Sequence, residues 1–69
     1  MLNLVSYAII VNMDYFVIIS NKRYNTNMDR WAKTNMDKDT YLWDIAPAAW
    51  VLYFKFESDL LVFRLRWGL

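Results

Sequence analysis

The side chains that most often act as catalytic bases and nucleophiles are missing, because the 69 residues include neither histidine nor cysteine. Seven carboxylates are the remaining candidates: Asp14, Asp29, Asp37, Asp39, Asp44, Glu57 and Asp59. Asp37 and Asp39 could touch a cation, but the glycine and distal glutamate of a calcium loop are lacking. The single glycine, Gly68, leaves no phosphate-binding loop. We therefore expect no enzyme, no cofactor and no metal site.

Basic and aromatic residues are interleaved in the middle of the chain, a pattern typical of surfaces that stack single-stranded bases. The residues concerned are Lys22, Arg23, Tyr24, Arg30 and Lys33. A net charge of only +1 gives little electrostatic support for nucleic acid. Ordinary surface charge is the simpler explanation, and a nucleic-acid-binding module is the alternative.

Three further aromatic residues are candidates for contacts with a partner. We expect Trp31 to anchor a helix against the sheet rather than to be exposed. Tyr41 and Trp43 lie in a segment without clear periodicity, and aromatic residues in such segments often form the centre of a protein interface. For these two residues, an interface and a core position are both open.

The composition predicts one domain, residues 1–69, with more aromatic surface than a small core encloses. Apolar residues make up 58% of the chain, with four Trp, five Tyr and four Phe, and no disulfide or cysteine- or histidine-based zinc site is available. We expect a homo-oligomer or a partner-binding protein that covers the excess. The alternative is a compact monomer with an unusually aromatic core.

Residues 50–67 alternate between large apolar and other side chains, which predicts a C-terminal β-hairpin. With the turn at Ser58 and Asp59, one face holds Trp50, Leu52, Phe54, Phe56, Leu61, Phe63, Leu65 and Trp67. Phe54 then lies opposite Phe63, and Tyr53 on the other face lies opposite Arg64. A cation–π pair would explain that second pair without a ligand.

Residues 2–11 and 15–20 are rich in β-branched and aromatic residues, which predicts two strands joined by a turn at residues 12–14. A single strand with a bulge is the alternative. Asp14 would be costly in a membrane-spanning helix, and no basic residue precedes the apolar run as in a secretory signal. We expect a cytoplasmic protein without membrane contact.

The polar segment that follows contains one predicted helix, over residues 27–38. Thr26 or Asn27 is its expected cap, and Asp29 lies in its first turn. Pro47 predicts a sharp change of chain direction before the hairpin. The predicted fold is α+β, a small antiparallel sheet of about four strands with one short helix in the crossover between strands two and three, ending in the C-terminal β-hairpin.

The sequence over residues 59–65, Asp-Leu-Leu-Val-Phe-Arg-Leu, resembles the Asp-aliphatic-aliphatic-x-aromatic-Arg ending of short phage proteins. The small size and the surplus of aromatic residues are also similar to those of phage accessory proteins. The resemblance implies a phage-type inhibitor that acts in the cytoplasm of the host cell. Its partner would be a host or defence-system protein, and no site residue carries over.

The leading hypothesis is therefore a small protein-binding module that occludes a protein partner. A single-stranded nucleic-acid-binding module is the first alternative. A structural subunit of a homo-oligomeric assembly is the second.

Overall fold

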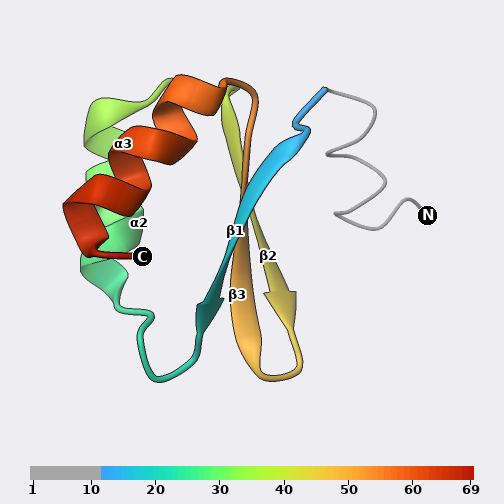
Figure 1. The fold of residues 1–69 in the computed structure, drawn as a ribbon, viewed down its shortest axis with the longest axis vertical. Helices are drawn as coiled ribbons and strands as arrows, with labels where there is room; N and C mark the ends of the chain where they lie inside the picture. Colours follow the sequence, from blue (N-terminus) through green and yellow to red (C-terminus); the bar gives the residue numbers. More distant parts are fainter. Residues whose placement is uncertain (1–11) are drawn as a thin grey trace.

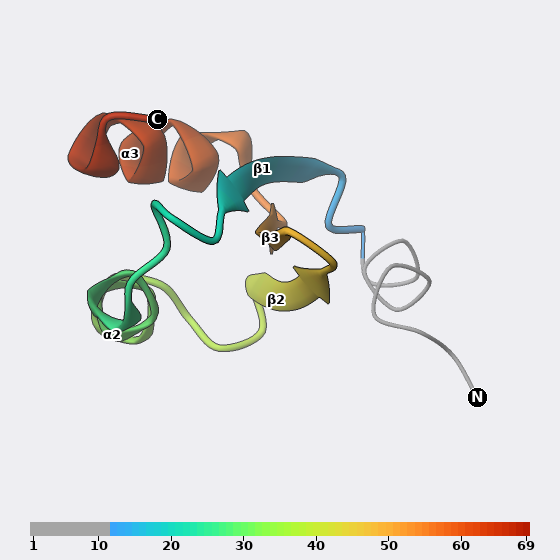
Figure 2. The same cartoon turned by 90° about the horizontal axis from the view of Figure 1, so that it is seen from below.

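The computed structural model of the chain describes residues 12–69 (Figure 1). Its elements are β1 (Tyr15–Ser20), α2 (Thr26–Asn35), β2 (Tyr41–Ala46), β3 (Ala49–Phe54) and α3 (Glu57–Trp67). The three strands form one antiparallel sheet in the order β1-β3-β2, so β3 is central. Both helices lie on one face of this sheet, α3 on the side of β1 and α2 on the side of β2 (Figure 2).

Strands β2 and β3 form a tight hairpin. Ala46 pairs with Ala49, so Pro47 and Ala48 alone make the turn. Pro47 has no backbone N–H and a fixed φ, which suits a turn position and stops a strand. The backbone N–H of Asn21 donates to the carbonyl of Ala48 at 3.3 Å, which ties the end of β1 to this turn. The predicted change of direction at Pro47 is confirmed.

Alternation along the strands divides the sheet into a helix-covered face and an open face. Ile19, Leu52 and Phe54 point towards the helices and are buried. Phe16 and Ile18 alternate with the inward residues of β1 and are exposed. Within residues 12–69 no element covers this second face, so part of the predicted surplus of apolar surface is exposed here.

Helix α2 begins at a side-chain cap. Asn25 is extended, and its Oδ1 accepts a hydrogen bond from the backbone N–H of Asn27 at 2.9 Å. Met28 and Ala32, one helical turn apart, are the buried residues of the helix and face the sheet. The helix was predicted over residues 27–38 with Thr26 or Asn27 as the cap. The structure ends it at Asn35, because Met36 is extended, and uses Asn25 instead.

The buried core lies between the sheet and the two helices. Every described element except β2 contributes to it, and so does the residue that follows α2. Its members are Ile19, Met28, Ala32, Met36, Leu52, Phe54 and Phe63. Half-buried aromatic residues surround this core, and Trp43 and Trp50 of the β2–β3 hairpin are among them. Much of the aromatic surface is therefore packed at the margin of the core, where each ring is partly buried and partly accessible to solvent.

The predicted C-terminal β-hairpin is wrong, because its second arm is helix α3. Glu57 and Asp59 lie in the first turn, and Arg64 and Arg66 lie in the last turn, an order that complements the helix dipole. Gly68 follows with φ +68°, the left-handed conformation that commonly ends a helix. The charges and the glycine at the two ends are therefore compatible with the helix that forms.

The predicted sheet of about four strands is also wrong, since the described sheet has three. The α+β class and a helix between β1 and β2 agree with the prediction. Both edges of β3 are taken, by β1 and β2, so no edge of β3 is free to pair with residues 61–67. The strand predicted over residues 15–20 is confirmed, whereas the strand predicted over residues 2–11 lies outside the described residues.

Candidate functional site

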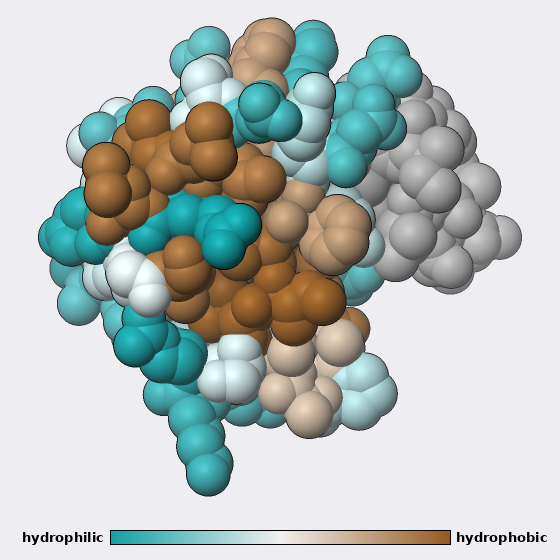
Figure 3. Space-filling model, in the orientation of Figure 1, coloured by the Kyte–Doolittle hydropathy of each residue, from teal (hydrophilic) through white to brown (hydrophobic). Residues whose placement is uncertain are grey.

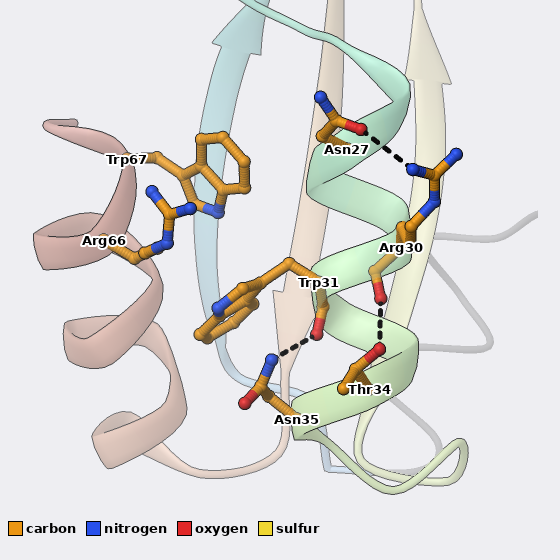
Figure 4. Close-up of a pocket in the computed structure, with 7 residues that line it drawn as sticks. All are labelled: Asn27, Arg30, Trp31, Thr34, Asn35, Arg66 and Trp67. Atoms are coloured by element: carbon orange, nitrogen blue, oxygen red, sulfur yellow. Dashed lines mark hydrogen bonds between the residues drawn. The ribbon is translucent and has the colours of Figure 1, made fainter.

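A groove lies between α2 and α3 on the side of the helices away from the sheet (Figure 4). Its volume is about 360 Å³. The lining residues are Asn27, Arg30, Trp31, Thr34, Asn35, Arg66 and Trp67. The lining thus combines arginines, tryptophans and uncharged polar residues with no carboxylate, so it favours a ligand that brings its own negative charge.

Two half-buried tryptophans form the apolar walls of the groove, Trp31 from α2 and Trp67 from α3. Both contact the buried ring of Phe63, Trp31 edge-on at 5.8 Å between ring centroids and Trp67 at 6.3 Å. A shared contact with a fully buried ring restricts the rotamers of both walls. The groove is therefore held in shape by the core.

Arg66 is the charged group that points from α3 towards α2 (Figure 4). Its guanidinium lies over the ring of Trp67, 4.5 Å from the centroid, as a cation–π pair. Within residues 12–69 the Arg66 side chain has no hydrogen bond or ion pair, since the single ion pair there joins Lys33 to Asp29. The N–H edge of this guanidinium is therefore free to bind an acceptor.

The indole of Trp67 supplies a second unused donor. Its Nε1 atom is buried and has no hydrogen-bond partner among the described residues. A buried donor without an acceptor costs roughly 1–3 kcal/mol of stability, so such groups usually have a reason. This donor belongs to the same ring on which Arg66 stacks, so the two unused donors lie together.

The polar side chains of α2 are occupied by their own helix. Arg30 Nη1 donates to Asn27 Oδ1 at 3.4 Å, and Asn35 Nδ2 donates to the carbonyl of Trp31 at 2.9 Å. Thr34 Oγ1 donates to the carbonyl of Arg30 at 3.0 Å. Figure 4 shows the Arg30 side chain pointing away from α3. The groove therefore has one wall whose polar side chains bond within their own helix, and another, on α3, whose donors have no partner among the described residues.

An apolar surface on α3 borders the groove. Leu61, Val62 and Leu65 are 56%, 52% and 85% exposed, and we call these three residues the α3 stripe. Val62 lies one helical turn before Arg66, so the stripe reaches the edge of the groove. Figure 3 shows hydrophobic side chains gathered over α3. Apolar surface and free donors are thus adjacent on one side of the molecule.

The predicted basic and aromatic cluster is divided among different structural contacts. Arg23 Nη2 donates to the carbonyl of Trp67 at 2.6 Å and so holds the end of α3. Tyr24 stacks on Trp50 with centroids 4.4 Å apart and contacts Trp43 edge-on at 5.4 Å. One face of the Tyr24 ring is thus covered by Trp50, and both Tyr24 and Trp43 pack against aromatic residues of the protein itself.

The other predicted site residues lie in different environments. Lys33 forms an ion pair with Asp29 at 3.0 Å, and this hydrogen bond raises the pKa of Lys33. Lys22 is exposed in the turn after β1. Tyr41 is half-buried in β2, and burial raises its pKa. Of the eight predicted residues, only Arg30 and Trp31 line the groove.

The sequence-based prediction missed the part of the groove that comes from α3. The predicted hairpin placed Trp67 on its apolar face and Arg66 on its polar face, so it did not bring these two residues together with Arg30 and Trp31. One signal was present: Leu60, Phe63 and Trp67 follow the spacing of one helix face. Asn27, Thr34 and Asn35 carry no sequence signal beyond their polarity.

Within residues 12–69, no group of three acidic side chains comes together as a metal site would require. The helices of this part of the chain are also too short and too polar to cross a membrane. Comparison with protein families, with curated proteins and with solved structures finds no match to the chain.

Proposed function

We propose that the chain is a small non-enzymatic protein-binding module. Its binding face is the groove between α2 and α3 together with the α3 stripe. The observation that carries the proposal is the exposure of Leu61, Val62 and Leu65 on a helix that is anchored on its other side by buried Phe63. Apolar surface bordered by polar groups is typical of protein interaction sites.

The composition of the groove supports the same function. Trp31, Trp67 and Arg66 are of the residue types that contribute most to protein interfaces, because they bury large rigid surfaces and form directional hydrogen bonds. Their shared contact network through Phe63 and Trp67 means that little side-chain entropy is lost on binding. Such a preorganised face suits binding rather than chemistry.

In its most concrete form, the module is a phage-type inhibitor that covers a functional surface of a host or defence protein in the host cytoplasm. Steric occlusion needs affinity and a rigid surface but no catalytic group. Homo-oligomerisation belongs to the same proposal, because the exposed Phe16 and Ile18 offer a second apolar surface on the opposite side of the sheet. The size of the protein in solution tests this part.

Binding of single-stranded nucleic acid is the second candidate function. It is favoured by one observation, the presence of two arginines and two tryptophans in a single groove. The contacts of Tyr24 and Lys33 count against it, since both belonged to the predicted cluster and both are engaged within the protein. Steep weakening of binding with salt would distinguish this function from protein binding.

The proposed function is tested by retention of partners from a bacterial lysate on the tagged chain of residues 1–69, with and without nuclease. Leu65→Ser interrupts the α3 stripe, and Ile45→Ser is the matched control because Ile45 is a 68% exposed aliphatic residue of β2. We expect one protein to co-purify in stoichiometric amount, also after nuclease treatment. The Ile45→Ser variant should retain this protein, and the Leu65→Ser variant should not. Loss of every partner on nuclease treatment, or equal retention by both variants, would overturn the proposed face.

A further inference from the structure

We propose that the groove between α2 and α3 is a receptor for a carboxylate side chain, an Asp or Glu that lies among apolar residues in a segment of the partner. The guanidinium of Arg66 and the indole Nε1–H of Trp67 are its donors. This inference rests on the proposed function and adds to it the chemical nature of the partner segment.

The position of the Arg66 guanidinium is the first observation that supports a carboxylate site. One face of its guanidinium is covered by the ring of Trp67 at 4.5 Å, which fixes the plane of the group. Within residues 12–69 no acceptor uses its N–H edge. A planar guanidinium with a free edge binds a carboxylate through two parallel hydrogen bonds. Stacking on Trp67 therefore prepares Arg66 for a planar anion.

The indole of Trp67 is the second, independent support. Its buried Nε1–H has no acceptor in the part of the chain that is described, and the ring is also a wall of the groove. Figure 4 shows this nitrogen on the edge of the ring next to the guanidinium of Arg66, which stacks on the same ring. An oxygen bound beside Arg66 would then satisfy this donor as well.

The surroundings favour one isolated negative charge over a chain of phosphates. Arg30 points away from α3, and Lys33 is paired with Asp29, so Arg66 is the cation available in the space between the helices (Figure 4). Nucleic-acid binding depends on several cations that track a backbone. The neighbouring Val62 is apolar and exposed, which suits an aliphatic side chain next to the acidic one.

The experiment follows the indole N–H signals of the ¹⁵N-labelled chain of residues 1–69. There are four such signals, one per tryptophan. The probes are a blocked peptide of alternating Glu and Leu, the same peptide with Gln in place of Glu, inorganic phosphate and a short oligothymidylate. We expect the Glu peptide to shift the Trp67 signal saturably and to bind roughly tenfold or more tighter than the Gln peptide. Phosphate and oligothymidylate should bind more weakly.

Arg66→Gln should lose that preference for Glu over Gln, and Arg66→Lys should keep part of it, because lysine keeps the charge but not the bidentate geometry. Arg64→Gln is the matched control, since it removes the same charge from the same helix at a residue outside the groove lining. It should keep the preference within about twofold. Dispersed backbone signals in each variant show that the fold is intact.

Three results would overturn the inference: no saturable shift of the Trp67 signal with the Glu peptide, equal affinity for the Glu and Gln peptides, or tighter binding of oligothymidylate. Its failure can be separated from failure of the proposed function. If Arg66→Gln still retains the lysate partner that Leu65→Ser loses, the chain is a protein-binding module whose partner does not use a carboxylate in the groove.

Discussion

The rings of Phe54 and Phe63 lie 5.7 Å apart at an interplanar angle of 57°, although Phe54 belongs to the central strand and Phe63 to helix α3. Both side chains are completely buried. The hairpin predicted from the sequence also brought these two residues together, but as partners across two strands. The contact between the two rings was predicted, but helix α3, which makes it, was not. Stability measurements on residues next to Phe63 therefore distinguish the helix from the predicted hairpin.

Phe63→Ala is expected to destabilise the protein by about 3–5 kcal/mol, because it removes a buried ring that contacts Phe54, Trp31 and Trp67. Leu65→Ala is expected to change stability by less than about 0.5 kcal/mol, because Leu65 is 85% exposed. Urea unfolding followed by circular dichroism measures both. A large loss for Leu65→Ala would contradict the helix, because the hairpin places Leu65 in the core.

Gly68→Ala is expected to cost about 1 kcal/mol by strain at a left-handed backbone position. A Cβ at Gly68 would meet only Arg23 Nη2, at the ordinary contact distance of 3.9 Å, so the cost comes from φ +68° and not from a clash. Gly68→Asn should cost less, since asparagine tolerates this conformation. Equal losses for both substitutions, measured by thermal unfolding, would indicate a packing effect instead.

Asn25→Ala is expected to destabilise the protein by about 0.5–2 kcal/mol, because it removes the oxygen that caps the Asn27 N–H at the start of α2. Asn25→Asp should keep most of the stability, since a carboxylate also accepts this bond. Asn21→Ala, at an exposed residue of the preceding turn, is the control. If the Asn21 and Asn25 variants are equally mild, the cap contributes nothing in solution.

Alkaline pH is expected to destabilise the fold through its tyrosines. Burial, followed by the nearby Asp29 carboxylate, raises the pKa of Tyr24 and of Tyr41 above 10.0, and burial followed by Asp44 raises that of Tyr53. The folded state therefore keeps these protons to higher pH than the unfolded chain does. The stability that the protonated tyrosines contribute is fully present below the tyrosine pKa of the unfolded chain. It is lost as the pH rises through the higher tyrosine pKa of the folded protein.

The measurement for this prediction is the free energy of unfolding at pH about 8 and about 11, on the two sides of the ordinary tyrosine pKa. Tyr24→Phe keeps the ring stacked on Trp50 but removes one titrating group. The variant should lose less stability than the parent chain between these two pH values. An identical loss in both proteins would exclude Tyr24 as a contributor.

Helix α2 and strand β1 were predictable because short-range rules fix them. A polar segment with an Asn or Thr cap and a one-sided apolar pattern gives a helix, and six β-branched, aromatic or small residues give strand β1. The turn at Pro47 follows from proline alone. Of the groove, the sequence indicated Arg30 through the basic and aromatic pattern and Trp31 as a possible partner contact, and both lie on this predictable helix.

The α3 half of the groove was not predictable in the same way, because residues 57–67 satisfy two patterns at once. Leu61, Phe63, Leu65 and Trp67 alternate as in a strand, whereas Leu60, Phe63 and Trp67 follow one face of a helix. Both patterns bury Phe63, so the periodicity of the segment does not choose between a strand and a helix. The decision therefore lies outside the segment.

By itself, the sequence determined a small α+β chain, rich in aromatic residues, without the usual catalytic side chains, and with Phe54 and Phe63 in its core. The tertiary structure alone decided that the segment after β3 is a helix. Strand β3 already pairs with β1 and β2 on its two edges, while Leu52 and Phe54 on its inner face still need a cover. A helix supplies that cover because it satisfies its own backbone hydrogen bonds and needs no free strand edge.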